Sequence, residues 1–124
     1  MEKLQILIID DDPGLRKTLS DMLTANGYET AAAKDGREGL ALLNRYSVNL
    51  ALIDLVLPDI PGIDLLERIK AGSPLTEAIV LTGNATLDSA IEATNRGAFS
   101  YIVKPYEPER LLLHIRRAFE KQRA

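Results

Sequence analysis

The sequence predicts an α/β protein in which helices cover both faces of a parallel β-sheet. Two observations predict this class. Short aliphatic runs alternate with stretches of helical periodicity about five times along the chain. Several runs are apolar at consecutive positions, such as residues 6–9 within the run 4–9, which is typical of strands covered on both faces. Repeated strand–helix units with right-handed crossovers produce a parallel sheet with helices on both sides.

Five strands are predicted from the aliphatic runs, each bounded by Gly, Pro, Asn or Asp. They lie at residues 4–9, 28–33, 50–53, 78–81 and 99–103. The helices between and after them are predicted from apolar side chains at helical spacing. In order, these stripes are Leu15, Leu19, Met22 and Leu23; Leu40 and Leu43; Leu65, Leu66 and Ile69; Leu87, Ala90, Ile91 and Thr94; and Leu111, Leu112, Ile115, Ala118 and Phe119. Stop signals at residues 26–27, 71–74 and 95–97 end the first, third and fourth helices.

Composition and charge restrict the class of protein. Residues 1–124, with 46% hydrophobic and 27% charged residues and no linker or repeat, are predicted to form a single domain. The absence of cysteine excludes disulfides, thiolate metal sites and cysteine nucleophiles. No signal peptide is recognisable and the aliphatic runs are too short to cross a bilayer, so we expect a soluble, cytoplasmic protein without membrane contact. A net charge of -3 and a pI near 5.2 argue against direct nucleic-acid binding.

Charged and hydroxyl side chains follow four of the five predicted strands. They are Asp10, Asp11 and Asp12 after the first, Asp54 after the third, Thr82 after the fourth and Lys104 after the fifth. In sheets of this class, ligands bind beyond the carboxyl ends of the strands. Because Asp12 precedes Pro13-Gly14, it is predicted to cap the first helix, while Asp10 and Asp11 face the pocket.

Electrostatics makes this arrangement informative. Two carboxylates about 4 Å apart repel by roughly 4 kcal/mol at an effective dielectric near 20. Asp10, Asp11 and Asp54 would therefore destabilise the fold unless one keeps a proton or a cation lies among them. Hard oxygen ligands without His or Cys suit Mg²⁺, or alternatively Mn²⁺. With Lys104 adding a positive charge, Asp54 can act as a nucleophile that forms an aspartyl phosphate.

Four stretches in this order resemble the receiver (response-regulator) domains of two-component signalling: IIDDDPGLR, IDLVLPDIPGIDLL, VLTGNA and FSYIVKPYEPE. The resemblance covers essentially the whole chain and implies a flavodoxin-like sheet of order 2-1-3-4-5. It implies the following roles: Asp10 and Asp11 as the acidic pair, with Asp11 binding the metal directly; Asp54 as phosphoacceptor; Val56 as a metal ligand through its backbone carbonyl; Thr82 as switch hydroxyl; Lys104 as phosphate-binding lysine; and Tyr101 as switch aromatic. The choice of acidic pair rests on the spacing to Arg16. The Lys104–Pro105 bond is expected to be cis, and Val56 and Asn84 occupy positions that influence the lifetime of the phosphorylated state.

The resemblance also implies a mechanism and partners. A histidine kinase, a phosphotransfer domain of a phosphorelay, or a small phosphodonor would phosphorylate Asp54 in a self-catalysed reaction, without turnover of an external substrate. The modified domain would act on an output domain or protein through the fourth helix, fifth strand and fifth helix, and a homodimer through the last helix is an option. Residues 1–124 would be a complete regulator or a piece of a longer regulator or hybrid kinase.

Three alternatives are weighed against this interpretation. A phosphatase of the haloacid dehalogenase type needs a second Asp two residues after its nucleophile, where this chain has Val56. A flavodoxin-like cofactor-binding module needs a glycine- or hydroxyl-rich loop after the first strand, and residues 10–13, DDDP, would repel a phosphate there. A degenerate receiver used only as a scaffold is disfavoured because the set of site residues is intact.

Two further features are interpreted conservatively. His114, the only histidine, lacks the flanking pattern of a phosphorelay domain and is predicted to be an ordinary helical residue. The last helix carries a basic cluster made of Arg110, Arg116, Arg117, Lys121 and Arg123. We interpret this cluster as a complement to the helix dipole and as a solvated or partner-facing surface, not as a DNA-binding site.

Overall fold

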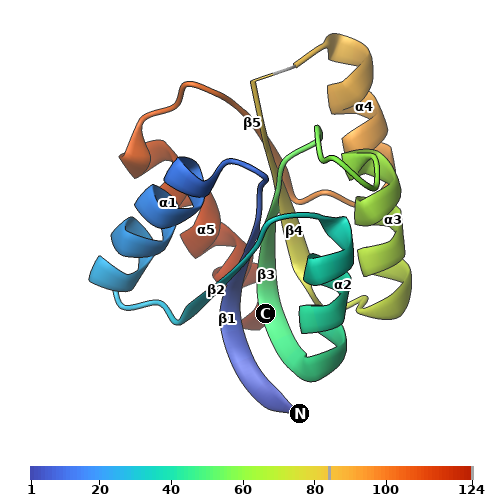
Figure 1. Ribbon diagram of the computed structural model, residues 1–124. Coiled ribbons are helices and arrows are strands. Elements are labelled where there is room, and N and C mark those ends of the chain that lie inside the picture. Colours follow the sequence, from blue (N-terminus) through green and yellow to red (C-terminus); the bar gives the residue numbers. More distant parts are fainter. Residues whose placement is uncertain (84, 124) are drawn as a thin grey trace.

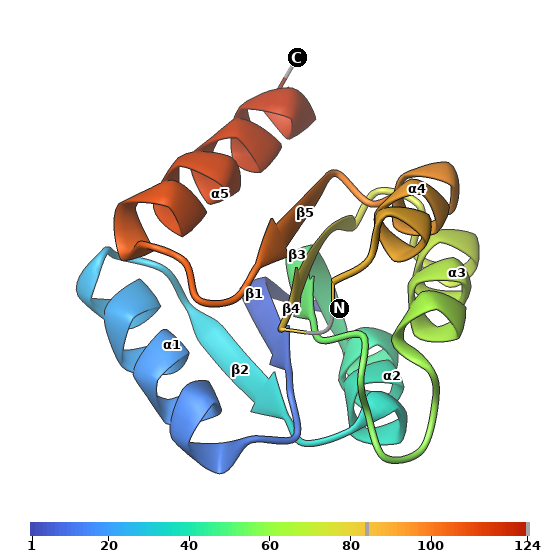
Figure 2. The same cartoon turned by 90° about the horizontal axis from the view of Figure 1, so that it is seen from above.

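A computed structural model describes residues 1–83 and 85–123. Five parallel strands form one sheet of order β2-β1-β3-β4-β5, which confirms the predicted class and strand order (Figure 1). The elements are β1 (Glu2–Ile9), α1 (Pro13–Ala25), β2 (Thr30–Ala33), α2 (Gly36–Arg45), β3 (Tyr46–Ile53), α3 (Gly62–Gly72), β4 (Glu77–Thr82), α4 (Leu87–Asn95), β5 (Ser100–Val103) and α5 (Pro108–Arg123). Helices α1 and α5 lie on one face, and α2, α3 and α4 on the other (Figure 2).

The sheet separates two hydrophobic cores. Successive side chains of a strand point to opposite faces, so Ile6 and Ile8 of β1 pack toward α1 and α5, while Leu7 and Ile9 pack toward the other helices. All four side chains are essentially inaccessible to solvent. This two-sided burial explains why the strand is apolar at consecutive positions.

The register brings the ends of the strands together. Ile9 at the end of β1 is paired with Ile53 at the end of β3, and the next residue, Asp54, donates its backbone N–H to the Ile9 carbonyl at 3.0 Å. On the other side of the sheet, the backbone N–H of Lys104 donates to the Thr82 carbonyl at 2.9 Å. The residues that follow β1, β3 and β5 therefore meet at one edge of the sheet with Thr82.

Predicted helix ends and caps are confirmed in detail. Gly27 and Gly97 have φ of 89° and 100°, in the left-handed region that glycine adopts without strain. They follow α1 and α4 at the predicted stop signals. The side chain of Asp12 accepts hydrogen bonds from the backbone N–H groups of Gly14 and Leu15, as expected of a cap.

The third strand is longer than predicted. It begins at Tyr46, directly after α2, instead of at residue 50. Its first three residues pair with residues 2–4 of β1, and of its first four residues only Val48 is buried. Because polar side chains interrupt the aliphatic run there, a criterion based on consecutive apolar residues missed this half-covered part.

Helix α4 forms as predicted, but its apolar stripe does not face the core. Leu87 is 76% exposed and Ile91 is 50% exposed, whereas Ala93 is the buried residue of this helix. An ion pair between Arg96 and Glu67 joins the end of α4 to α3 at the surface. The helical spacing was interpreted correctly, and the stripe contributes instead to an exposed apolar surface.

Candidate functional site

The structure groups three of the predicted acids at the carboxyl edge of the sheet. Asp10, Asp11 and Asp54 each present a carboxylate oxygen, and these atoms all lie within 4.8 Å of one another. Asp10 is buried at 3% exposure, Asp54 is half-buried and Asp11 is exposed. The acids therefore form a cluster, called the acidic pocket below, that is buried at Asp10 and exposed to solvent at Asp11.

Lys104 lies between two of these acids. Its Nζ is 2.9 Å from Asp10 Oδ2 and 3.2 Å from Asp54 Oδ2. Burial is the largest single influence on the pKa of Lys104 and lowers it, but the hydrogen bonds and charges of Asp10 and Asp54 together outweigh burial and raise the pKa above its usual value. Within residues 1–83 and 85–123, one ammonium opposes three carboxylates, which leaves an excess of two negative charges in this cluster.

Asp10 is held on several sides. Its Oδ1 accepts the backbone N–H of Asp12 at 2.9 Å and its Oδ2 accepts Lys104 Nζ. Its backbone carbonyl accepts Arg16 Nη1 at 2.8 Å. Sequence reasoning used Arg16 only for its spacing and missed this contact. The sequence did contain a signal for this contact, because Arg16 lies one helical turn after the Asp12 cap. Asp10 is thus fixed by protein groups, whereas Asp11 is exposed to solvent.

The segment after β3 turns sharply beside Asp54. The backbone N–H of Val56 donates to Asp54 Oδ1 at 3.1 Å, which orients that carboxylate. Gly62 packs against this turn so closely that a Cβ there would lie 2.3 Å from Leu55 Cα and 2.7 Å from the Asp54 carbonyl oxygen. Only glycine therefore fits between α3 and the segment that carries Asp54.

Asp59 anchors the same loop to helix α2. Its carboxylate accepts the backbone N–H groups of Gly36 and Arg37, each at 2.9 Å, at the start of that helix. Burial is the largest single influence and raises the pKa of Asp59, but hydrogen bonds from Gly36, Arg37, Ile60 and its own backbone together lower it below its ordinary value. A negative charge at a helix N-terminus is also favoured by the helix dipole.

Thr82 and Tyr101 lie on the neighbouring strands β4 and β5. Thr82 ends β4 and is fully buried. Tyr101, half-buried, has its hydroxyl 2.7 Å from Ser89 Oγ in the first turn of α4. Ser89 Oγ also lies 3.0 Å from the Thr86 carbonyl oxygen, so this hydroxyl pair is part of the N-terminal cap of α4. The sequence did not indicate this contact.

The remaining predicted positions can be placed briefly. The Lys104–Pro105 bond is cis, as expected. Asn84 lies outside the described residues. His114 is in α5, with Nδ1 2.8 Å from Ser100 Oγ on β5, outside the acidic pocket. Burial, and then the charges of Arg110 and Arg117, lower the pKa of His114 below 6.5.

The model of the response regulator receiver domain family matches residues 6–116. The chain therefore belongs to the response regulator receiver domain family and is a receiver domain of two-component signal transduction. The family match favours this interpretation over the phosphatase and cofactor-binding alternatives.

Individual relatives agree with this assignment. The chain is 38% identical over 116 residues to the transcriptional regulatory protein GlrR of Escherichia coli and 36% identical over 111 residues to the response regulator protein PilR of Pseudomonas aeruginosa. These alignments cover 94% and 90% of the chain, but only 26% and 25% of the relatives. The chain thus spans about a quarter of the length of the curated relatives that it matches.

Solved structures show the same fold. A CheY-like receiver domain protein of Methanospirillum hungatei superposes with a TM-score of 0.94 at 37% identity, and 98% of each chain is covered. The beryllofluoride-activated NtrC4 receiver domain dimer gives a TM-score of 0.90 at 33% identity, covering 95% of this chain and 98% of the other. In the described part of the chain, no helix is both long enough and apolar enough to cross a membrane.

Proposed function

We propose that Asp54 is the phosphoacceptor of this receiver domain, with Asp10, Asp11 and Lys104 as its partners. The observation that carries the proposal is the position of the Asp54 carboxylate, which lies 3.2 Å from the Lys104 ammonium and within 4.8 Å of both other acids. Lys104 attracts an incoming phosphoryl group, while the excess of acids attracts a metal cation.

The donor set fits Mg²⁺, or Mn²⁺ as a substitute. The three acids supply hard oxygen ligands and carry two unbalanced negative charges, and neither histidine nor cysteine is among them. Asp11 and Asp54 would hold the ion directly together with the Val56 carbonyl, and Asp10, which is bound to Lys104, would complete the acidic metal site. When bound, the ion would neutralise charge on the phosphoryl oxygens.

The reaction on this chain is a transfer to a carboxylate. An oxygen of Asp54 attacks phosphorus, the new bond is O–P, and the P–N bond of a phosphohistidine donor breaks, with its electron pair staying on the imidazole. The backbone N–H of Val56 orients the Asp54 carboxylate. Lys104 binds the phosphoryl oxygens, and the hydroxyl of Thr82 then turns toward the new dianion, with Tyr101 responding as the switch aromatic.

Labelling with acetyl phosphate in Mg²⁺ tests the acceptor. The wild type should gain the mass of one phosphoryl group, and Asp54→Asn should not. Asp64→Asn is the matched control, because Asp64 is an exposed acid in the first turn of α3. Labelling of Asp54→Asn at the wild-type rate would contradict the assignment.

The output surface consists of α4, β5 and α5. It exposes Leu87, Ile91, Val103 and Leu113. Asp88 and Glu92 on α4 are acidic, whereas Arg110 and Arg117 on α5 are basic. In a dimer with a twofold axis, the acidic α4 of one copy would face the basic α5 of the other. The NtrC4 receiver neighbour is a dimer, which supports a homodimer here.

Analytical ultracentrifugation with Mg²⁺ and beryllofluoride tests this surface. Leu87→Asp should weaken self-association at least tenfold, because it places a charge in the apolar contact. Leu75→Asp is the control, since Leu75 is 87% exposed but lies at the opposite end of β4. Equal weakening by both variants would exclude a specific α4–β5–α5 dimer.

The whole protein's context follows from the family and stays a prediction. A histidine kinase or phosphotransfer domain supplies the phosphoryl group, and an output domain or protein reads the modified surface. The domain modifies itself and turns over no external substrate. We also predict that residues 1–124 form one domain and that the protein is located in the cytoplasm.

A further inference from the structure

A buried carboxylate outside the phosphoryl site lies at the other end of β4. Glu77 is the first residue of this strand and is only 6% exposed. Thr82, at the far end of the same strand, borders the acidic pocket. All six residues of β4 are buried. A charged group in such a position needs partners, because an unpaired buried charge is strongly destabilising.

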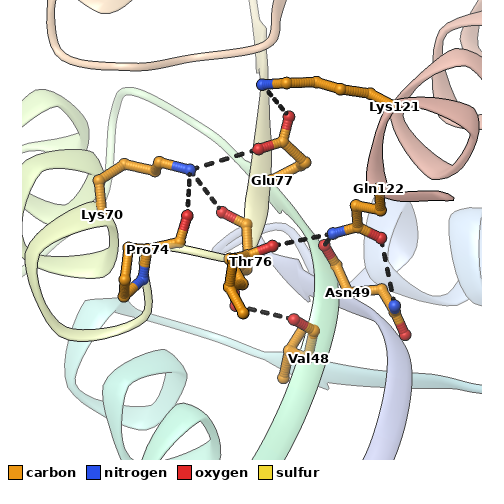
Figure 3. Close-up of polar contacts among 9 residues, drawn as sticks. Val48, Asn49, Lys70, Pro74, Thr76, Glu77, Lys121 and Gln122 are labelled. Atoms are coloured by element: carbon orange, nitrogen blue, oxygen red, sulfur yellow. Dashed lines mark hydrogen bonds and ion pairs between the residues drawn. The ribbon is translucent and has the colours of Figure 1, made fainter. Parts of the chain in front are cut away.

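Lysines from both faces of the sheet supply these partners (Figure 3). Lys70 of α3 has its Nζ 3.4 Å from Glu77 Oε1, and it also donates to the carbonyls of Pro74 at 3.1 Å and Thr76 at 2.9 Å. Lys121 of α5 has its Nζ 2.8 Å from Glu77 Oε2. One carboxylate at the start of β4 thus connects α3 to α5 across the sheet.

The residue after Lys121 strengthens the connection. Gln122 Nε2 donates to the carbonyls of Asn49 at 2.7 Å and Leu75 at 2.9 Å, and Gln122 Oε1 accepts from Asn49 Nδ2 at 3.2 Å (Figure 3). The last turn of a helix ordinarily frays, because its final carbonyls lack helical partners. Here side chains bind that turn to the sheet on two sides.

We propose that Lys70, Glu77, Lys121 and Gln122 form a clamp that fixes the last turn of α5 to the start of β4. The Glu77 clamp makes β4 a connector between Thr82 at the phosphoryl site and the C-terminal turn of α5. When β4 shifts along its axis, Glu77 shifts with it, and the clamp transmits this shift to the last turn of α5. Without the clamp, the last turn of α5 would not follow the shift of β4. The clamp itself exists without phosphorylation, whereas its response to the site rests on the proposed function.

Hydrogen exchange of the unmodified protein tests the clamp directly. Glu77→Gln and Gln122→Ala should each speed exchange of the amides of residues 119–123 roughly tenfold, because hydrogen bonds that hold the turn are lost. Glu120→Gln is the matched control, an identical change at an exposed position in the same turn. Exchange in β1 reports global unfolding, and Gln122→Ala alone decides the test if Glu77→Gln fails to fold. Wild-type exchange at residues 119–123 in the clamp variants would overturn the proposal.

The connection to the site is tested by adding Mg²⁺ and beryllofluoride. Exchange at residues 119–123 should change at least threefold in the wild type, and Gln122→Ala should reduce this response by at least half. A full response in Gln122→Ala would overturn the role of the clamp as a connector. If beryllofluoride does not bind to the wild type, the proposed function is wrong, and the experiment on the unmodified protein still decides whether the clamp exists.

Discussion

The two ends of the sheet each hold a buried carboxylate with lysine partners, but the balance of charge is opposite. At the carboxyl end, one lysine faces three acids. At the amino end, two lysines face the single acid Glu77. Only the first arrangement leaves negative charge uncompensated, so only it calls for a cation. A cluster of acids and lysines therefore indicates a ligand site where the acids are in excess, and a structural bridge where the lysines are in excess.

The largest effect on stability is expected at the carboxyl end of the sheet, from a substitution that changes no charge. Gly62→Ala should lower the free energy of unfolding by about 3 kcal/mol, because the new Cβ overlaps the backbone of Leu55. Urea denaturation measures this loss. Gly72→Ala is the control, since a Cβ there meets nothing within 4 Å. Equal stabilities for the two variants would refute the close approach.

Neutralising the acid at the amino end should cost somewhat less. Glu77→Gln should lower the free energy of unfolding by about 2 kcal/mol, because two lysines lose their common anion while Lys70 keeps its backbone carbonyls. Asp54 phosphorylation by acetyl phosphate should proceed at a comparable rate, since Glu77 lies at the far end of β4 from the site. An abolished rate in a folded variant would contradict the separation of the two ends.

Neutralising an acid at the carboxyl end should have the opposite sign in metal-free buffer. Asp11→Asn should leave stability unchanged or raise it slightly, because it removes a repelling charge. Mg²⁺ at ten times its dissociation constant should stabilise the wild type by about 1.4 kcal/mol and Asp11→Asn much less. Thermal unfolding with and without Mg²⁺ measures both effects, and Glu77→Gln should keep the Mg²⁺ response. An undiminished response in Asp11→Asn would exclude Asp11 as a metal ligand.

The pH dependence of the lysine at the carboxyl end sharpens the comparison further. The pKa of Lys104 is raised in the folded state, so its contribution to stability is complete below its unfolded pKa of 10.5 and is lost as pH rises through the folded pKa. The stability difference between the wild type and Lys104→Met should therefore shrink at alkaline pH. A difference that stays constant from pH 9 to about 12 would show that the charge of Lys104 is not responsible.

His114 should give the smallest effect. Its pKa is lowered in the folded state, so its contribution is present above 6.5 and is lost as pH falls through the folded pKa. The wild type should lose slightly more stability than His114→Gln between pH 7 and pH 5. Urea denaturation at both pH values measures the difference. Identical losses would show that folding does not lower the pKa of His114.

Sequence patterns predicted the sheet and the acidic pocket because both depend on local signals. Consecutive apolar residues at β1 required burial on two faces, and Asp10 and Asp54 follow strands whose ends meet in a parallel sheet. The solvent-facing stripe of α4 was less predictable, because helical spacing identifies a face but not its partner. The Glu77 clamp joins residues far apart in the chain, and no local pattern encodes such a contact.

The shallow attachment of α4 has an energetic consequence. Ala93 is its buried residue, and Leu87 and Ile91 lie in solvent, so shifting this helix sacrifices little apolar contact. Each tenfold change in a conformational equilibrium requires only about 1.4 kcal/mol of differential binding. A single phosphoryl group can supply that difference, whereas the same group could not repack a helix buried like α5. The thinly anchored helix is the part of the molecule that a small chemical signal can reposition.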